Sequence, residues 1–142
     1  MAILSHLRLL TVFPLFFLSF HVFAQSDDIR AKLEQRVEET NKILPLSVKQ
    51  GLVYKKNYID NYTVYEIHEI DETYISFSAL KHNKRLMKRT ILKRYGEDTN
   101  LKSFAKLAVD CNMDVVIRYV SKQSSDFFEL IIKTKDLEKC LK

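Results

Sequence analysis

The feature that most limits how this chain folds is an apolar run of fifteen residues from Leu9 to Phe23, preceded by one cationic residue, Arg8. A charged start, a short apolar run and small residues before a cleavage point are typical of an export signal. The tripeptide "VFA" at 22–24 meets the last requirement, and a transmembrane helix would need about 20 apolar residues. We therefore predict that residues 1–24 are a cleaved signal peptide, and that the protein is exported, periplasmic or secreted, and soluble after cleavage.

Cleavage after residue 24 leaves 118 of the 142 residues for folding. That length is typical of one compact domain, so residues 25–142 are predicted to form a single domain. Five of the nine Phe leave with the signal, so the core has to be built mainly from Leu, Ile, Val and Tyr. With two Gly in the whole chain, a Gly-rich phosphate loop is excluded.

Two cysteines, Cys111 and Cys140, fall within the predicted domain. In an oxidising compartment two thiols of a small exported domain usually pair, so we predict a disulfide between them. It would close a loop of about 30 residues and stabilise the fold by roughly 3 to 4 kcal/mol in the chain-entropy treatment. No metal site is predicted, because neither His-Glu-x-x-His nor Cys-x-x-Cys occurs, and no cofactor is expected.

The predicted elements begin with a helix and a hairpin. Ser26 followed by two Asp is a helix start, and apolar residues then recur at three- and four-residue spacing until Pro45 ends the helix. From Val48 the residues become β-branched and aromatic, which predicts strands near 48–56 and 61–70 around the turn "NYIDN". Gly51 is expected to mark a bulge in the first of these strands.

A basic helix is predicted next. The stretch "KHNKRLMKRTILKRY" at 81–95 carries seven Lys or Arg and no acid. On a helical wheel the apolar residues form one stripe and the basic residues lie elsewhere, which indicates an amphipathic helix with a basic outer face. Gly96 is expected to end this helix, and Asp98 or Thr99 to cap a third one that carries Cys111 in its last turn. The predicted stripe consists of Phe77, Leu80, Met87, Ile91 and Tyr95.

Two strongly alternating segments, "MDVVIRYVS" and "DFFELIIKT", close the chain as a hairpin with the loop "KQSS". The predicted order is α-β-β-α-α-β-β. This order is typical of an α+β domain: an N-terminal helix and an antiparallel sheet of about four strands, with two further helices packed on one face. The residues that alternate on the predicted inner face are Met113, Val115, Ile117, Tyr119, Phe128, Leu130 and Ile132.

Two stretches resemble a known group of proteins. Residues 41–70, "NKILPLSVKQGLVYKKNYIDNYTVYEIHEI", resemble the opening of small exported bacterial proteins of unassigned function, in which Asn and Leu-Pro end a helix, a Val and a Gly follow, and a Tyr-x-x-Tyr strand comes next. Residues 109–140 resemble the closing hairpin and terminal Cys of the same group, although its first Cys precedes the short helix that Cys111 follows here. The resemblance implies export, size and fold, and it implies no catalytic residue.

Tyrosine gathers around the first predicted hairpin. This residue is enriched in binding surfaces because it presents rigid amphipathic area, and it also suits half-buried strands. A binding role is predicted for these side chains together with the basic helix face. The candidate binding residues are Tyr54, Tyr58, Tyr62, Tyr65, Lys81, Arg85, Lys88 and Arg89.

The predicted function is that of a non-enzymatic exported binding protein of the cell envelope, for example an inhibitor or immunity-type partner of another envelope or extracellular protein. One alternative is a small hydrolytic enzyme that uses His68 with nearby Glu66 and Glu69, although an exposed strand His without a catalytic role is favoured. Another is binding of anionic lipid or glycan through the basic helix 80–95. Export removes most intracellular nucleic acid from reach, so no nucleic-acid binding is predicted.

Overall fold

The computed structural model describes residues 26–142, and the predicted signal peptide lies outside the described residues. The described chain opens with an N-terminal helix over 26–43. Leu33 and Val37, one turn apart on this helix, are buried in the core. The helix ends before Pro45 as predicted, because proline cannot continue the hydrogen-bonding pattern of a helix.

The first predicted strand is in fact two strands, β1 (Leu46–Lys49) and β2 (Leu52–Asp60). Gly51 has φ +82° and lies in the turn between them, so it is not a bulge in one strand. A Cβ at this position would lie 2.7 Å from the Cβ of Tyr74. Both the positive φ and the close approach require glycine here. The third strand, β3 (Thr63–Ile70), pairs with β2 as predicted.

The predicted basic helix is divided at Asn83 into α2 (Phe77–His82) and α3 (Lys84–Glu97). The predicted apolar stripe faces the core. Phe77 and Tyr95 at its two ends are buried, and the partly buried residues between them pack against the core, namely Leu80, Met87 and Ile91. Gly96 does not end the helix as predicted. It lies inside α3, and α4 (Thr99–Asp110) follows after Asp98, whose side chain caps α4 as predicted.

The closing hairpin consists of β4 (Asp114–Ser121) and β5 (Phe127–Ile132), close to the predicted bounds. A short helix that was not predicted from the sequence, α5 (Thr134–Cys140), follows β5. The sheet has the order β1-β2-β3-β4-β5, and β3 pairs with β4 in parallel while the other pairs are antiparallel. The predicted all-antiparallel sheet is therefore wrong. Three helices connect β3 to β4, and such a crossover lets β4 run in the same direction as β3.

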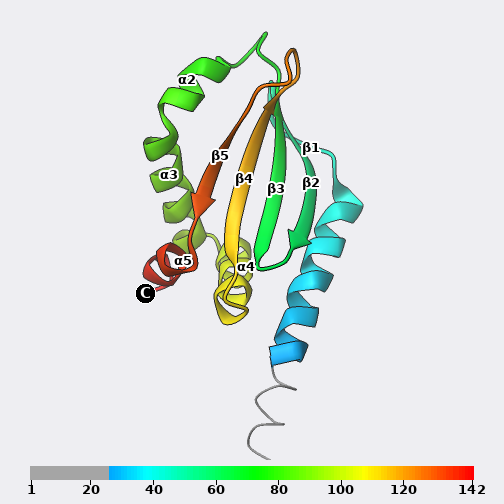
Figure 1. Ribbon diagram of the computed structural model, residues 1–142, viewed down its shortest axis with the longest axis vertical. Coiled ribbons are helices and arrows are strands. Elements are labelled where there is room, and N and C mark those ends of the chain that lie inside the picture. Colours follow the sequence, from blue (N-terminus) through cyan, green and yellow to red (C-terminus); the bar gives the residue numbers. More distant parts are fainter. Residues whose placement is uncertain (1–25) are drawn as a thin grey trace, which may run out of the picture.

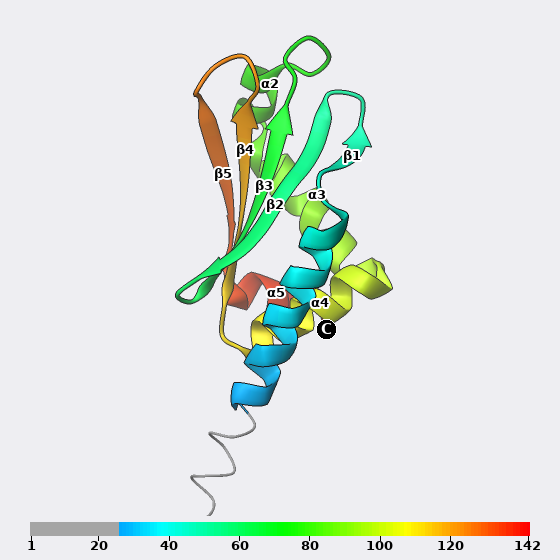
Figure 2. The same cartoon turned by 90° about the vertical axis from the view of Figure 1, so that its right-hand side faces the viewer.

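The predicted α+β class is confirmed: a mixed sheet packs against helices, with α3 and α4 on one side of it and the N-terminal helix beside β2 (Figures 1 and 2). The buried apolar residues come from both layers and form one core. All seven residues predicted for the inner face of the closing hairpin are buried. No helix within 26–142 combines the length and the apolar character that crossing a membrane requires.

The predicted disulfide is wrong, because Cys111 and Cys140 are both free thiols. Cys111 caps the end of α4, and burial is the main cause that raises the pKa of its thiol, with smaller effects from the charges of Arg30, Asp110 and Glu34. Cys140 ends α5, and its thiol donates a hydrogen bond of 3.1 Å to the carbonyl of Leu137. Because α5 follows β5, Cys140 lies among other residues than those that surround Cys111.

Candidate functional site

The inner face of β3, which meets the helices, carries two polar residues between two buried apolar ones. Val64 and Ile70 are fully buried at the two ends of this face. Glu66 and His68 lie between them at every second position, so they point to the same side of the sheet. Their side chains are only 14% and 12% exposed, respectively, which is unusual for ionisable groups. This pair therefore marks the candidate site.

A cavity of about 480 Å³ opens above the pair, between the inner face of the sheet, the edge strand β1 and α3. Its volume falls in the range of about 300–1,000 Å³ that is usual for ligand pockets. Apolar and aromatic side chains dominate its lining, and a few polar groups converge at its floor. The lining residues are Leu46, Ser47, Val48, Tyr54, Glu66, His68, Ile91, Arg94, Tyr95, Leu101, Ile117 and Tyr119. We call this space the β1–α3 cavity.

Glu66 is the centre of the polar floor. The Tyr95 hydroxyl, which comes from α3, donates a hydrogen bond of 3.3 Å to Glu66 Oε1. Glu66 Oε2 lies 3.5 Å from His68 Nε2. On the neighbouring strand β2, the buried Asn57 is the register partner of Glu66. Its Oδ1 has no hydrogen-bonding partner among the described residues. Asn57 does not line the cavity, and the one hydrogen bond that described residues donate to the Glu66 carboxylate comes from Tyr95.

His68 is enclosed by aromatic rings. The Tyr54 ring stacks on the imidazole with centroids 4.5 Å apart and planes 7° apart, and the Tyr119 ring lies at 5.3 Å and 33° on the other neighbouring strand. Neither ring nitrogen of His68 has a hydrogen-bonding partner within 26–142. The expectation of an exposed strand His is therefore wrong, because the parallel β3–β4 pairing places His68 in the interior of the sheet.

The three tyrosines around the floor act as neutral groups at physiological pH. Burial, and then the nearby charge of Glu66, raise the pKa of Tyr119 to about 12. The same two causes, in the same order, raise the pKa of Tyr54 and of Tyr95 well above the usual tyrosine value. Burial is the main cause of all three pKa shifts, and the Glu66 carboxylate is the charged group that all three side chains share as the second cause.

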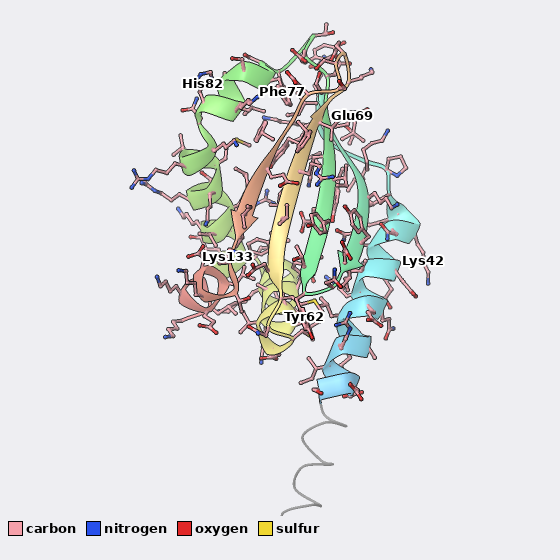
Figure 3. The ribbon with its side chains drawn as sticks, viewed as in Figure 1. Lys42, Tyr62, Glu69, Phe77, His82 and Lys133 are labelled. Atoms are coloured by element: carbon pink, nitrogen blue, oxygen red, sulfur yellow. The ribbon has the colours of Figure 1, made fainter. Side chains whose placement is uncertain are left out.

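The structure divides the predicted tyrosine cluster. Tyr54 lines the cavity. Tyr58 and Tyr65 are register partners on the opposite face of the sheet, and their rings stack with centroids 4.9 Å apart. Tyr62 is 69% exposed in the turn between β2 and β3, at the end of the sheet away from Glu69 (Figure 3). Tyr54 and Tyr58 are four positions apart, so a regular strand would place them on the same face. The register shift in β2 between Tyr54 and Lys56 places them on opposite faces.

The predicted basic residues do not line the cavity. Lys81 is exposed on α2, and Arg85 and Arg89 are exposed on α3. Lys88 forms an ion pair of 2.7 Å with Asp136 of α5, so it joins two helices. The basic residue that does line the cavity is Arg94, which is exposed at its rim and was not among the candidates.

Most of the cavity residues were missed as a group, although a sequence signal for two of them existed. In "VYEIHEI" the inner-face positions read Val64, Glu66, His68, Ile70, so polar residues interrupt an apolar face. A strand whose buried face carries ionisable residues indicates a site. The helical pattern places Tyr95 only on the packing stripe, because its hydroxyl contact with Glu66 depends on how α3 packs on the sheet.

A second hollow of about 600 Å³ lies between α4 and α5, and charged side chains such as Lys102, Lys106 and Glu138 line it. Those side chains are exposed, so this hollow lacks the buried polar group that marks the β1–α3 cavity. Among residues 26–142 no group of three or more His, Cys, Asp or Glu side chains is arranged to hold a metal ion.

No protein-family model matches the sequence, and no curated protein matches it either. The fold is similar to that of a protein from Pseudomonas aeruginosa described as secreted, with a TM-score of 0.63 and 5% identity over 79% of this chain and 95% of that chain. It is also similar to two pilotins. EpsS of the Vibrio vulnificus type 2 secretion system has a TM-score of 0.56 and 8% identity, over 80% of this chain and 96% of that chain. AspS of the Vibrio cholerae type II secretion system has a TM-score of 0.57 and 9% identity, over 80% of this chain and 97% of that chain. At these identities the similarity shows the fold that the chains share.

Proposed function

We propose that the protein is an exported, non-enzymatic binding protein of the cell envelope, and that it binds an extended segment of another envelope protein at β1 and the β1–α3 cavity. The observation that carries this proposal is the exposure of the apolar edge strand at the mouth of a cavity with a polar floor. Leu46 is 49% exposed and Val48 is 48% exposed, and both line the cavity.

The edge position of β1 supports an extended segment as the occupant. β1 pairs only with β2, so the backbone groups on its other side have no strand partner in the described sheet. An edge with unpaired N–H and C=O groups accepts an added strand, and side-chain pockets beside the edge then select the sequence. The cavity lies beside this edge and is suited to that selection.

The similar folds support the compartment. One is described as a secreted protein and two are pilotins of type 2 secretion systems, so this fold is used by proteins that work outside the cytoplasm or in secretion. The resemblance of residues 41–70 and 109–140 to small exported bacterial proteins points in the same direction. Partner binding needs a shaped surface, and it does not require a nucleophile.

Site-specific photocross-linking tests the proposal. A benzoyl-phenylalanine at position 48 should cross-link the protein to one partner in an envelope extract, and Leu46→Lys should abolish that product. The matched control is a cross-linker at Leu86, which is 59% exposed on α3 and does not line the cavity. The proposal is wrong if position 86 captures the same partner, or if Leu46→Lys leaves the product unchanged.

A small hydrolytic enzyme is the second candidate, because Glu66 and His68 lie 3.5 Å apart in the cavity. General-base catalysis requires the imidazole to contact a nucleophile or a positioned water. Ser47 lines the same cavity, but its hydroxyl contacts the carbonyl of Lys49. Hydrolysis of a panel of chromogenic esters and phosphates, lost in His68→Gln, would favour the enzyme over the binding protein.

A further inference from the structure

We propose that the floor of the β1–α3 cavity binds the cationic side chain of a lysine or arginine in the bound segment, with the Glu66 carboxylate as the counter-charge. The inference rests on the proposed function and adds the chemistry of the residue that the cavity selects. It is carried by three observations on the described residues: the under-satisfied carboxylate, the walls around it, and the distribution of charge along the cavity.

The carboxylate of Glu66 has few donors. An ionised carboxylate can accept about four hydrogen bonds. The described residues supply one, from the Tyr95 hydroxyl at 3.3 Å, which is long for a bond between two oxygen atoms. His68 Nε2 lies at 3.5 Å and has no hydrogen bond. A buried charge with so few partners is costly, and an ammonium or guanidinium group supplies both donors and the opposite charge.

The walls suit a long side chain with a charged end. Tyr54, Ile91 and Tyr119 line the cavity together with Leu101, so methylene groups would contact apolar and aromatic surface on the way to the floor. Lysine and arginine bury their methylene stems in such surroundings while the charged end reaches a polar group. Cations are also attracted to tyrosine rings. The cavity is therefore apolar along its length and negative at its end.

The charges along the cavity leave the floor negative. The ionisable groups that line it are Glu66, His68, Arg94 and the three neutral tyrosines. Arg94 is exposed at the rim, where water and salt screen its charge, whereas Glu66 is largely buried and is screened much less. An anionic side chain would meet Glu66 without a compensating cation at the floor.

Nuclear magnetic resonance titration of the ¹⁵N-labelled protein tests the inference with n-butylguanidinium as the probe. Two probes of similar size serve as comparisons: n-pentanol, which is uncharged, and butyrate, which is anionic. We expect butylguanidinium to shift the amides of β3 around Glu66, and Glu66→Gln to weaken this binding by roughly tenfold or more. Glu69→Gln is the matched control, because Glu69 occupies the same strand on the opposite face and pairs with Lys55.

The inference is overturned if butyrate or pentanol shifts the same amides as strongly as butylguanidinium does, or if Glu66→Gln binds the probe as well as Glu69→Gln. The comparison of the three probes on the unmodified protein does not depend on the folding of any variant. If butyrate bound better than butylguanidinium, the cavity would select an acidic side chain and not a basic one.

The cross-link from position 48 separates a failure of this inference from a failure of the proposed function. If Leu46→Lys abolishes the cross-link and Glu66→Gln leaves it at full yield, the segment binds at β1, but the inference that Glu66 binds its cationic side chain is refuted. If Leu46→Lys leaves the cross-link intact, the proposed binding function itself is refuted. Loss of the cross-link in both variants, with Glu69→Gln unaffected, supports both.

Discussion

The hydroxyl of Tyr95 on α3 donates a hydrogen bond of 3.3 Å to Glu66 Oε1 on β3, and this bond joins the helical layer to the sheet at the floor of the cavity. Tyr95→Phe removes the donor and keeps the ring. We expect it to lower the free energy of unfolding by about 1 kcal/mol, because a hydrogen bond to a charged group is lost but this one is long. Urea unfolding followed by circular dichroism measures the change.

Tyr62→Phe is the matched control for that experiment, since its ring is 69% exposed in the β2–β3 turn. A surface substitution of this kind usually changes stability by less than about 0.5 kcal/mol. An equal loss in the two variants would mean that the Tyr95 hydroxyl makes no special contribution to the packing of α3 on the sheet.

Gly96 permits α3 and α5 to approach each other closely. A Cβ at this position would lie 2.6 Å from the carbonyl oxygen of Cys140. Gly96→Ala should therefore destabilise the protein by about 1 to 3 kcal/mol through overpacking, even though alanine is the better helix former. Thermal unfolding measures the loss, and Ser103→Ala at an exposed position of α4 should show none. A more stable Gly96→Ala variant would mean that α5 can move away at little cost.

Asp71 makes stability depend on pH in the acid range. Hydrogen bonds from Lys122, first, and then from Thr73 and Gln123 hold the pKa of Asp71 well below its usual value. Because the folded-state pKa is lowered, this stabilisation is fully present above the unfolded-state pKa of about 4 and is lost as pH falls through the folded-state pKa. We expect Asp71→Asn to be less stable than the unmodified protein at pH 6 and the difference to shrink towards pH 2.

Urea midpoints measured at several pH values from 6 to 2 check this prediction. Asp126→Asn is a suitable control, because Asp126 is exposed and forms no ion pair among the described residues. A difference between Asp71→Asn and the unmodified protein that stayed constant over this range would show that the charge of Asp71 is not the source of the stabilisation.

Both cysteines should be free thiols in the folded protein. Burial is the main cause that raises the pKa of Cys111 and of Cys140, so the reactive thiolate is scarce at neutral pH. We expect native protein to take up two carbamidomethyl groups slowly from iodoacetamide, as measured by mass spectrometry, and a reductant to leave the urea midpoint unchanged. Protein that resists alkylation until it is reduced would instead contain the disulfide that the sequence suggested.

Local signals in the sequence predicted most of the elements. The alternating apolar residues of the closing hairpin placed β4 and β5 within one or two residues, because every second position of a strand faces the same layer. Proline after the N-terminal helix and Asp98 before α4 placed those boundaries for similarly local reasons. The parallel pairing of β3 with β4 was missed, since it depends on the path of the helical crossover rather than on any residue in the strands.

The site shows the same limit. The sequence by itself determined that Glu66 and His68 share a face of β3 with Val64 and Ile70, because that relation follows from the period of a strand. Only the tertiary structure decided that this face is covered and that Tyr95 reaches Glu66. It also decided that β1 leaves a cavity open beside them. These contacts join residues far apart in the chain, and their free energy depends on burial and on the packing of α3 against the sheet, which no local pattern contains.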